Sequence, residues 1–337
     1  MRTTLKDIAS ELGITTATVS RALNDHPEIS SATKKKVKAI ARRLNYLPNK
    51  LASSLRSGKS KIIGILVPSV EHLFFGAIIH GISNIASHYG YDVLIYQSNE
   101  SEEFEKKGID TFIAARVDGI LVSVSKNTKN YSHFQDVKSK NIPMAFFDRS
   151  IESFDVSTVC IDDYKGGYIA TKSLINSGYK NIAHICGPQH IKAFAERHRG
   201  FKDALIDSYY PYDSNRVFEG DITIQAGRNG FKHFWKQLSK PDAIFAVEDF
   251  TALGILKELK INDIKVPSEF GVMGFCNDLF GEHITPSLST IDQKTIQMGE
   301  ESFKLIYELI HQENPYSTYQ KRILTPSLIL RESSLKD

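Results

Sequence analysis

From residue 61 onward, short apolar runs alternate with segments in which apolar residues recur at helical spacing. Residues 61–68 form the first run, which is nearly continuous from Ile62 to Val67. Such a run is typical of a parallel strand that is buried on both faces. A helical pattern follows at Ile78, Ile82, Ile85, Ala86 and Tyr89, and further strands are predicted at residues 91–96, 119–124, 143–147, 181–186, 243–246 and 271–275. This alternation predicts a doubly wound α/β body.

The predicted body spans residues 61–337, which is large for one sheet of this kind. We therefore expect two lobes with a cleft between them. Ligands of open α/β sheets bind beyond the carboxyl ends of the strands. Residues that directly follow the strands are therefore the candidates for a binding site.

Polar and aromatic side chains follow several of these strands. Phe74 and Phe75 come after the first strand, and the other candidates in such positions are Ser123, Asp148, Arg149, Glu248 and Asp249. Arg197 lies in the segment 196–200, and its guanidinium group suits carboxylates or polyol oxygens. Either ring could instead belong to the core, and any one of the polar residues could be a surface group. Their shared placement after strands favours a polar binding site.

The first 60 residues predict a separate domain of three short helices. Thr4 and Asp7 have the spacing of a capping box at the start of the first helix, and Gly13 ends that helix with a sharp turn. Thr15 can cap the second helix, and Ser30 or Ser31 the third. The apolar stripes of the three helices are Leu5, Ile8, Ala9 and Leu12, then Val19, Ala22 and Leu23, then Val37, Ile40, Ala41 and Leu44. Three such stripes are sufficient for one small core.

The second helix of this domain leaves Thr16, Ala17, Ser20 and Arg21 outside its apolar stripe. Short side chains with one arginine suit a helix that enters the major groove of DNA, where arginine pairs with guanine through two hydrogen bonds. Two helices joined by a turn that contains glycine, the second exposing such a face, match helix-turn-helix geometry. The alternative is an ordinary three-helix bundle.

Charge is distributed unevenly along the chain. Residues 1–60 hold 12 Lys and Arg against 4 Asp and Glu, whereas the rest of the chain holds 30 against 35. A basic head on a mildly acidic body indicates that only the head meets a polyanion. The alternative is a solvated basic surface.

A short helix is predicted directly after the three-helix domain. Pro48 suits a first helical turn, Asn49 could cap residues 50–55, and the helix would stop before Gly58. Helices shorter than about 12 residues are marginal in water, so we expect this one to form only with a second copy and DNA. Leu55 at its end could wedge between base steps in the minor groove. The alternative is a flexible linker, with Leu55 packed on the body.

The sequence argues against export, metal binding and catalysis. The three cysteines, Cys160, Cys186 and Cys276, are isolated and lack metal-ligand spacing, so reduced thiols in the cytoplasm are expected. We find no apolar signal core and no run of 18 apolar residues that would predict a membrane helix. The motifs G-x-G-x-x-G after a strand, H-E-x-x-H and G-x-S-x-G are missing. We therefore expect neither a cofactor nor a metal, and no enzyme activity.

Several segments of the head resemble the LacI/GalR family of bacterial transcription regulators. They are Thr4–Ala9, Gly13, Thr18–Asn24 and Leu44–Asn49, and the similarity continues through the body to about Arg331. The resemblance implies that Thr16, Ala17 and Arg21 face bases in the major groove, and that Ala52 and Leu55 enter the minor groove. The other DNA-binding residues that it implies are Thr4, Thr18, Ser20, Asn24, Tyr46 and Arg56.

The resemblance also implies a domain organisation. Residues 1–48 would be the helix-turn-helix domain, residues 49–60 a hinge helix with a linker, and residues 61–337 an effector-binding and dimerisation domain. This body would look like a periplasmic sugar-binding protein with two lobes. The N-lobe would comprise residues 61–161 plus 293–320, the C-lobe residues 162–292 plus 321–337, and the crossings between lobes would fall near Ile161, Asp292 and Lys321.

The resemblance places an effector in the cleft, lined by Phe74, Ser123, Asp148, Arg197, Glu248, Asp249 and Cys276. Cys276 is a departure, because the family commonly has an aspartate that hydrogen-bonds the effector at this position. A thiol is a weak donor and a weak acceptor. The usual grip on a sugar is therefore missing unless Asn277 or Asp278 substitutes. A reactive thiol at Cys276 is a second hypothesis.

The implied function is a sequence-specific, DNA-binding transcriptional regulator, and most members of the family are repressors. It would bind a palindromic double-stranded DNA operator as a homodimer, through surfaces near residues 78–86 and 253–259. A sugar-like effector in the cleft would control its DNA affinity by favouring one lobe arrangement. Two alternatives stay open: a ligand-binding sensor without a DNA role, and a regulator controlled by a partner protein.

Overall fold

The computed structural model of the protein describes residues 3–46, 58–71, 73–151 and 153–336. The chain divides into two compact units, the head at residues 1–60 and the body at residues 61–337. Most of the predicted hinge helix, including Ala52, Leu55 and Arg56, lies outside the described residues.

The head consists of helices α1 (Leu5–Leu12), α2 (Thr16–Leu23) and α3 (Ser31–Arg43). The predicted caps are present: the backbone N–H of Thr4 donates to Asp7 Oδ2 at 2.7 Å, and that of Thr18 donates to Thr15 Oγ1 at 3.1 Å. Gly13 ends α1 with a φ of 64°, where glycine carries no steric penalty. The core that joins the three helices contains Ile8, Ala9, Val19, Ala22, Val37 and Ala41. The predicted three-helix domain is therefore confirmed.

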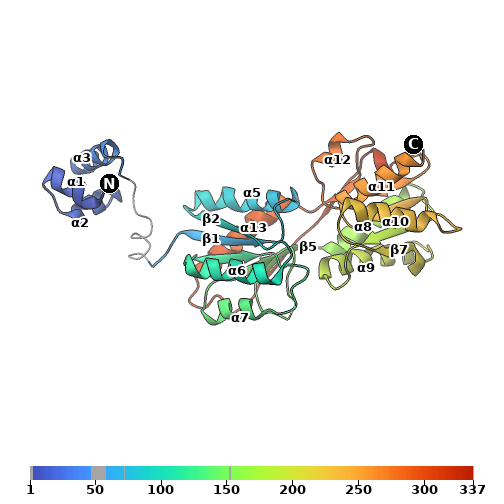
Figure 1. Cartoon of the computed structure of the whole chain (residues 1–337), viewed down its shortest axis with the longest axis horizontal. Helices are drawn as coiled ribbons and strands as arrows, with labels where there is room; N and C mark the ends of the chain where they lie inside the picture. Colours follow the sequence, from blue (N-terminus) through green and yellow to red (C-terminus); the bar gives the residue numbers. More distant parts are fainter. Residues whose placement is uncertain (1–2, 47–57, 72, 152, 337) are drawn as a thin grey trace. The chain divides into compact units, whose positions relative to one another are not determined.

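Six parallel strands form the sheet of the N-lobe, in the order β11-β5-β4-β3-β1-β2. Of these strands, β1, β2 and β5 are labelled in Figure 1. The strands are β1 (Ile62–Val67), β2 (Asp92–Gln97), β3 (Gly119–Val122), β4 (Met144–Phe147), β5 (Thr158–Ile161) and β11 (Lys321–Leu324). Helices α5 (Leu73–His88) and α13 (Thr295–Ile310) cover one face, and α6 (Glu102–Ala114) and α7 (Ser132–Ser139) cover the other.

The C-lobe contains a second parallel sheet of four strands, in the order β7-β6-β8-β9. The strands are β6 (Ile182–Cys186), β7 (Val217–Glu219), β8 (Ala243–Ala246) and β9 (Gly271–Met273). One face packs on α8 (Asp163–Asn176) and α9 (Lys192–Ile206), and the other on α10 (Ile224–Trp235) and α11 (Asp249–Ile261). The remaining elements are α12 (Phe280–His283), the antiparallel pair β10 (Thr290–Asp292) and β12 (Ser327–Ile329), and two short 3₁₀ turns at Ser214–Arg216 and Glu332–Ser334.

These two sheets confirm the predicted two-lobed α/β body, but one predicted crossing is misplaced. The chain passes between the lobes after β5, after β10 and after β11. The sequence prediction put the third crossing at Lys321, whereas Lys321 to Leu324 pair with β5 in the N-lobe sheet. The crossing therefore follows Leu324. The strand was missed because an edge strand is half-exposed and lacks the continuous apolar run that marks a central strand.

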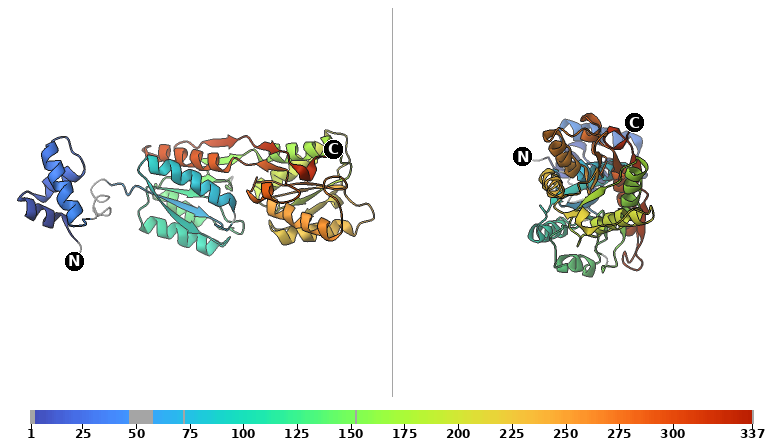
Figure 2. Two further views of the ribbon diagram at one scale, coloured as in Figure 1. Left: turned by 90° about the horizontal axis from the view of Figure 1, so that it is seen from above. Right: turned by 90° about the vertical axis from the view of Figure 1, so that its right-hand side faces the viewer.

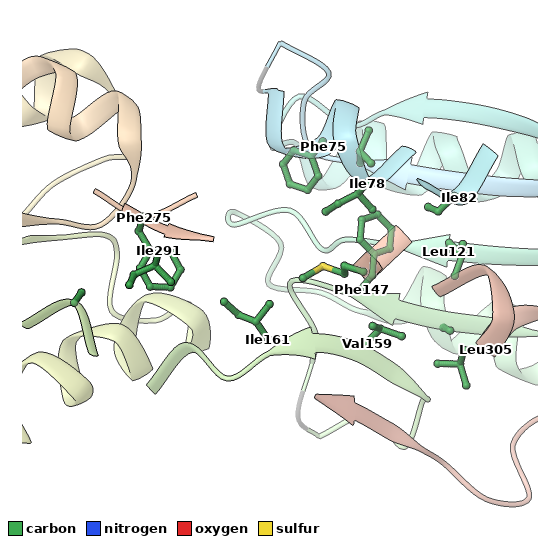
Figure 3. Packing of buried hydrophobic residues seen from close by; sticks show 14 of the residues in the cluster. Phe75, Ile78, Ile82, Leu121, Phe147, Val159, Ile161, Phe275, Ile291 and Leu305 are labelled. Atoms are coloured by element: carbon green, nitrogen blue, oxygen red, sulfur yellow. The ribbon is translucent and has the colours of Figure 1, made fainter. Parts of the chain in front are cut away.

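One buried apolar cluster runs through both lobes (Figure 3). In the N-lobe it contains alternate residues of the strands, such as Ile63, Ile65 and Val67, because side chains of a strand alternate between its faces. Near the crossings it includes Ile161, Phe275 and Ile291. The crossing segments are therefore part of the core.

Helices α5 and α13 lie against each other at unusually close range (Figure 2). A Cβ atom on Gly81 would lie 2.3 Å from the carbonyl oxygen of Ile296, and one on Gly299 would lie 2.2 Å from that of Ile78. Only glycine permits this approach of two backbones. Reciprocal contacts of the same kind join α8 to α9 at Gly167 and Gly200, and α10 to α11 at Gly227 and Gly254.

Gly299→Ala is expected to destabilise the body by about 1–3 kcal/mol, because the added methyl group must push α13 away from α5. Gly76 is the matched control, since it lies in α5 with no atom within 4 Å of its would-be Cβ. Gly76→Ala should stabilise by up to about 1 kcal/mol through helix propensity. Urea unfolding of both variants is the measurement, and equal stabilisation by the two substitutions would contradict the close contact.

Candidate functional site

Helix α2 of the head presents a small exposed face. Thr16, Ala17 and Arg21 are exposed, as predicted. The prediction that α2 leaves Ser20 outside its apolar stripe is wrong, because Ser20 is only 7% exposed, and its contact with DNA stays a prediction. Ser20 follows Val19 at the edge of the apolar stripe, and the side-chain amide of Asn24 folds back onto the Ser20 carbonyl at 2.9 Å. The three residues for which base contacts are predicted are therefore all at the surface of α2.

The other predicted DNA contacts in the head have roles in its own structure. Thr18 is half-buried, and its hydroxyl lies 2.9 Å from that of the capping residue Thr15. The hydroxyl of Thr4 donates to Asp7 at 2.8 Å, and Tyr46 packs on the core of the head. Because these bonds fix the ends of the helices, they also fix which side chains stand at the surface.

Sequence reasoning did not find the partner of Arg21. Its guanidinium group lies 3.4 Å from the carboxylate of Glu28, which also lies 3.7 Å from the His26 ring. Both members of the Arg21–Glu28 pair are more than half exposed. An exposed pair of this kind contributes little stability, so Arg21 can exchange Glu28 for another acceptor at small cost.

In the body, five of the seven predicted cleft residues line one small cavity, which we call the inner chamber. It has a volume of about 50 Å³, and the predicted residues on its wall are Phe74, Asp148, Arg197, Glu248 and Cys276. The wall also contains Phe75, Arg149, Ala193, Phe194, Ile222, Asp278 and Gln293. Ser123 and Asp249, which the sequence also nominated, are not on this wall.

Arg197 is buried and held from three directions. Its guanidinium group donates to Asp163 Oδ1 at 2.8 Å, to the carbonyl of Val247 at 2.9 Å and to Gln293 Oε1 at 3.2 Å. It also lies 3.8 Å from the centre of the Phe275 ring. Arginine has five N–H donors, so two remain for a ligand.

Asp148 and Arg149 follow β4 and form the N-lobe side of the wall. Burial raises the pKa of Asp148, while the nearby guanidinium groups of Arg149 and Arg197 act in the opposite direction. Arg149 donates to Glu100 at 2.8 Å. Ser123 lies behind the wall, and its hydroxyl donates to Asp148 at 3.4 Å, so it positions the carboxyl group.

Glu248 and Asp249 lie at the start of α11 and have different roles. Glu248 caps the helix by accepting from the backbone of Phe250 and Thr251, and burial raises its pKa to about 7. Asp249 is fully buried and accepts from the Thr290 hydroxyl and from the Asp278 backbone, each at 2.7 Å. Its oxygens thus fasten α11 to the neighbouring loop, which explains its absence from the wall.

The segment after β9 shows how Cys276, Asn277 and Asp278 are placed relative to the inner chamber. Its sulfur accepts from the Gln293 amide at 2.9 Å, and burial raises the thiol pKa well above its usual value. The thiolate is the reactive form of cysteine, so this environment opposes the reactive-thiol hypothesis. Asn277 turns away to accept from Arg331 at 2.9 Å. Asp278 is therefore the carboxyl group that this segment supplies to the inner chamber.

A second cavity, the outer chamber, has a volume of about 570 Å³ and shares Asp148, Arg149 and Ala193 with the inner one. Two contacts bridge the lobes beside it. Lys126 of the N-lobe pairs with Asp221 of the C-lobe at 2.6 Å, and the His190 ring lies 2.9 Å from the carbonyl of Lys126. The cleft thus contains room for a small molecule and direct contacts between its two sides.

Within the described ranges, no group of three or more His, Cys, Asp or Glu side chains is arranged to hold a metal ion. No helix in that part of the chain is both long and apolar enough to cross a membrane. The three cysteines are free thiols.

Comparison with known families identifies both units. Residues 4–49 match "Bacterial regulatory proteins, lacI family", and residues 60–327 match "Periplasmic binding proteins and sugar binding domain of LacI family". The chain belongs to the LacI family. As a member, it is a DNA-binding regulator of transcription whose head is the DNA reader and whose body is the ligand-binding part.

Individual relatives agree with this assignment. Catabolite control protein A of Priestia megaterium is 30% identical over 315 residues, which cover 93% of this chain and 94% of that protein. The HTH-type transcriptional repressor PurR of Vibrio parahaemolyticus is 30% identical over 335 residues, 99% of each chain. These relatives are named as regulators rather than as enzymes.

Solved structures show the same fold. A complex of the transcriptional regulator CelR with cellobiose is 27% identical and superimposes with a TM-score of 0.74, covering 98% of this chain and all of that one. The lac repressor dimer bound to operator and the anti-inducer ONPF is 24% identical with a TM-score of 0.88, covering both chains fully.

Sequence reasoning missed much of the inner chamber's wall as effector residues. Phe75 and Arg149 were strand-end candidates but were not among the seven predicted effector residues. Asp278 was named only as a substitute for Cys276, and Phe194 and Gln293 were not singled out. Phe194 precedes Arg197 by almost one helical turn and Gln293 directly follows β10, so the strand-end rule could have found the second.

Asp278→Asn is expected to stabilise the protein at pH 8 but not at pH 4. Burial and the nearby Asp249 and Glu248 raise the pKa of Asp278 from 3.8 to about 7. A carboxyl with a raised folded pKa destabilises the fold increasingly between its unfolded and folded pKa values, so the penalty appears between about pH 4 and 7 and is constant above. We expect a gain of roughly 2–4 kcal/mol at pH 8.

Thermal unfolding of Asp278→Asn between pH 4 and 8 is the measurement. The control is Asp110→Asn, since Asp110 is exposed on α6 and should show no such dependence. If the stability difference between Asp278→Asn and the unsubstituted protein did not change with pH, ionisation of Asp278 would not destabilise the fold.

Proposed function

We propose that this regulator is a repressor whose operator affinity is set by a small molecule bound between the lobes of the body. The main support is the inner chamber, whose wall combines Phe74 and Asp148 of the N-lobe with Arg197 and Glu248 of the C-lobe. A ligand that touches both lobes has different affinities for different lobe arrangements. Such a difference is the only way in which a ligand can shift an equilibrium.

Two relatives support the finer parts of this proposal. PurR of Vibrio parahaemolyticus is named as a repressor, which favours repression over activation. The solved structure of CelR is a complex with cellobiose, which favours a sugar-like effector of moderate size. The outer chamber of about 570 Å³ falls in the range of small-molecule sites.

The proposal includes a homodimer on a palindromic operator. The exposed face of α2 is short, with Thr16, Ala17 and Arg21 as its side chains, so two heads are needed for useful affinity. The outer face of α5, with exposed His80 and Asn84, is open to a second copy. Most of residues 253–259, the other expected surface, is buried within its own lobe.

The first test is selection of bound duplexes from a random DNA pool by the purified full chain at moderate salt. A palindromic consensus is expected, because the two-fold axis of a dimer is mirrored in its site. The genes beside genomic copies of that consensus then supply effector candidates for a release assay. No enrichment, either with or without added cell metabolites, would contradict the proposal.

Arg21→Ala is expected to weaken binding to the selected operator by about 1–3 kcal/mol and to relax the preference at one base position. The control is Arg42→Ala, since Arg42 is an exposed cation on α3. Any loss that this control shows should be equal for all sequences and should vanish at high salt. Fluorescence anisotropy on operator and scrambled duplexes separates the two patterns. An equal loss on both duplexes for Arg21→Ala would remove it from base reading.

A further inference from the structure

Carboxyl groups outnumber the available cations on the wall of the inner chamber. Asp148, Glu248 and Asp278 line it together with Arg149 and Arg197. Each guanidinium group already pairs at 2.8 Å with a carboxylate that is not on this wall, Arg149 with Glu100 and Arg197 with Asp163. Arg149 Nε also lies 3.9 Å from Asp148 Oδ2, whereas among the described residues no ion pair reaches Glu248 or Asp278.

Asp278 is the member of this set that lacks a partner. Its side chain is 7% exposed, and among the described residues no hydrogen bond or ion pair reaches its carboxylate. Its backbone, in contrast, is engaged: the N–H donates to Asp249 and the carbonyl accepts from Gly281. A buried carboxylate is costly unless it is paired. The fold therefore places the unpaired Asp278 carboxylate at the wall of a cavity, where a ligand could supply its partner.

The surroundings of Asp278 do not neutralise it. The charged groups that line the inner chamber with Asp278 are Asp148, Arg149, Arg197 and Glu248, with Asp249 behind them. Asp278 also lines a third cavity, whose wall adds Glu282 and Arg331. Arg331 donates instead to the Leu288 carbonyl and to Asn277. Burial raises the pKa of Asp278 to about 7, and the like charges of Asp249 and Glu248 act in the same direction.

Aromatic rings complete the wall. Phe74, Phe75 and Phe194 line the chamber, and the faces of aromatic rings attract cations. The Arg149 guanidinium already lies 5.9 Å from the ring centres of Phe75 and Phe194. Carboxylates combined with aromatic rings are the environment in which a protonated amine is recognised.

We infer that the inner chamber receives a protonated amino group, and that the effector is an amine-bearing small molecule of sugar size, such as an amino sugar. The volumes agree with this division, because about 50 Å³ accommodates a small group and the adjoining 570 Å³ accommodates the rest of the molecule. A neutral polyol would leave the Asp278 charge buried without a counter-ion. This inference rests on the proposed effector function and names the class of ligand.

The test is calorimetric titration of the full chain with matched pairs of probes at pH 6. The amino probes are glucosamine, galactosamine and mannosamine, and the neutral probes are the three parent sugars with N-acetylglucosamine. We expect at least one amino probe to bind at least tenfold more tightly than its neutral parent. Binding should also release about one proton, measured in two buffers of different ionisation enthalpy, because an ammonium group lowers the pKa of the carboxyl that it meets.

Asp278→Asn should abolish both the amine preference and the proton release. The control Asp110→Asn, on the exposed face of α6, should retain both. Since Asn keeps the shape of the side chain and removes only its charge, a folded Asp278→Asn variant is expected, and thermal unfolding verifies it.

Three outcomes would overturn the inference. The first is a neutral sugar that binds as tightly as its amino counterpart, which would leave the proposed effector function intact. The second is an amino probe that binds equally well to Asp278→Asn, and the third is binding by none of the amino probes. If, in addition, no neutral sugar bound and no metabolite released the protein from its operator, the proposed effector function would also be contradicted.

Discussion

The buried guanidinium group of Arg197 connects the parts of the body that must move together. It projects from α9 and bonds to Asp163, to Gln293 and to the carbonyl of Val247. Asp163 stands just after the first crossing between the lobes, Gln293 just after the second, and Val247 at the end of a C-lobe strand. One side chain on the wall of the cleft is thus bonded to residues beside two of the crossings. A ligand that changed these bonds would act directly on the segments through which the lobes are joined.

The cleft is also where the fold gives up stability. Glu248, Asp249 and Asp278 lie close together, and the pKa of each is raised to about 6 or 7. Cys276 and Asn277 have φ angles of 145° and 58°, which residues other than glycine rarely adopt. Backbone strain of this kind concentrates at functional sites. The glycine contacts between helix pairs lie elsewhere, in the layers that support the cleft. The body therefore combines rigid lobes with a strained, charge-rich opening between them.

The sequence predicts those features that depend on periodic burial or on a local bond. Strands buried on both faces, the apolar stripes of the head and the caps at Thr4 and Thr15 are of this kind, and the structure contains them. The half-exposed strand β11 was missed because two cations, Lys321 and Arg322, precede Ile323 and Leu324, so the segment contains neither a continuous apolar run nor regular alternation. The burial of Ser20 was missed because Ser20 lies beside Val19 at the edge of the apolar stripe, where a helical projection does not decide how much of a side chain is covered.

Within the cleft, the strand-end rule identified positions but not roles. It nominated Glu248 and Asp249 together, and only the three-dimensional contacts with Thr290 and Asp278 show that the second is a fastening of the fold. The choice between Cys276, Asn277 and Asp278 likewise depends on which way each side chain turns. These directions are set by long-range packing, which no local pattern encodes.

The pair between Lys126 and Asp221 has a consequence for how this regulator responds to its surroundings. Half of the Asp221 side chain is exposed, so dissolved ions weaken the attraction that holds the two sides of the cleft together. Ions also weaken the grip of a basic head on DNA. Ionic strength therefore acts on two properties of the molecule, the affinity of its head for DNA and the contact between its lobes. The ionic strength inside a cell would therefore help to set the ligand concentration at which the operator affinity changes.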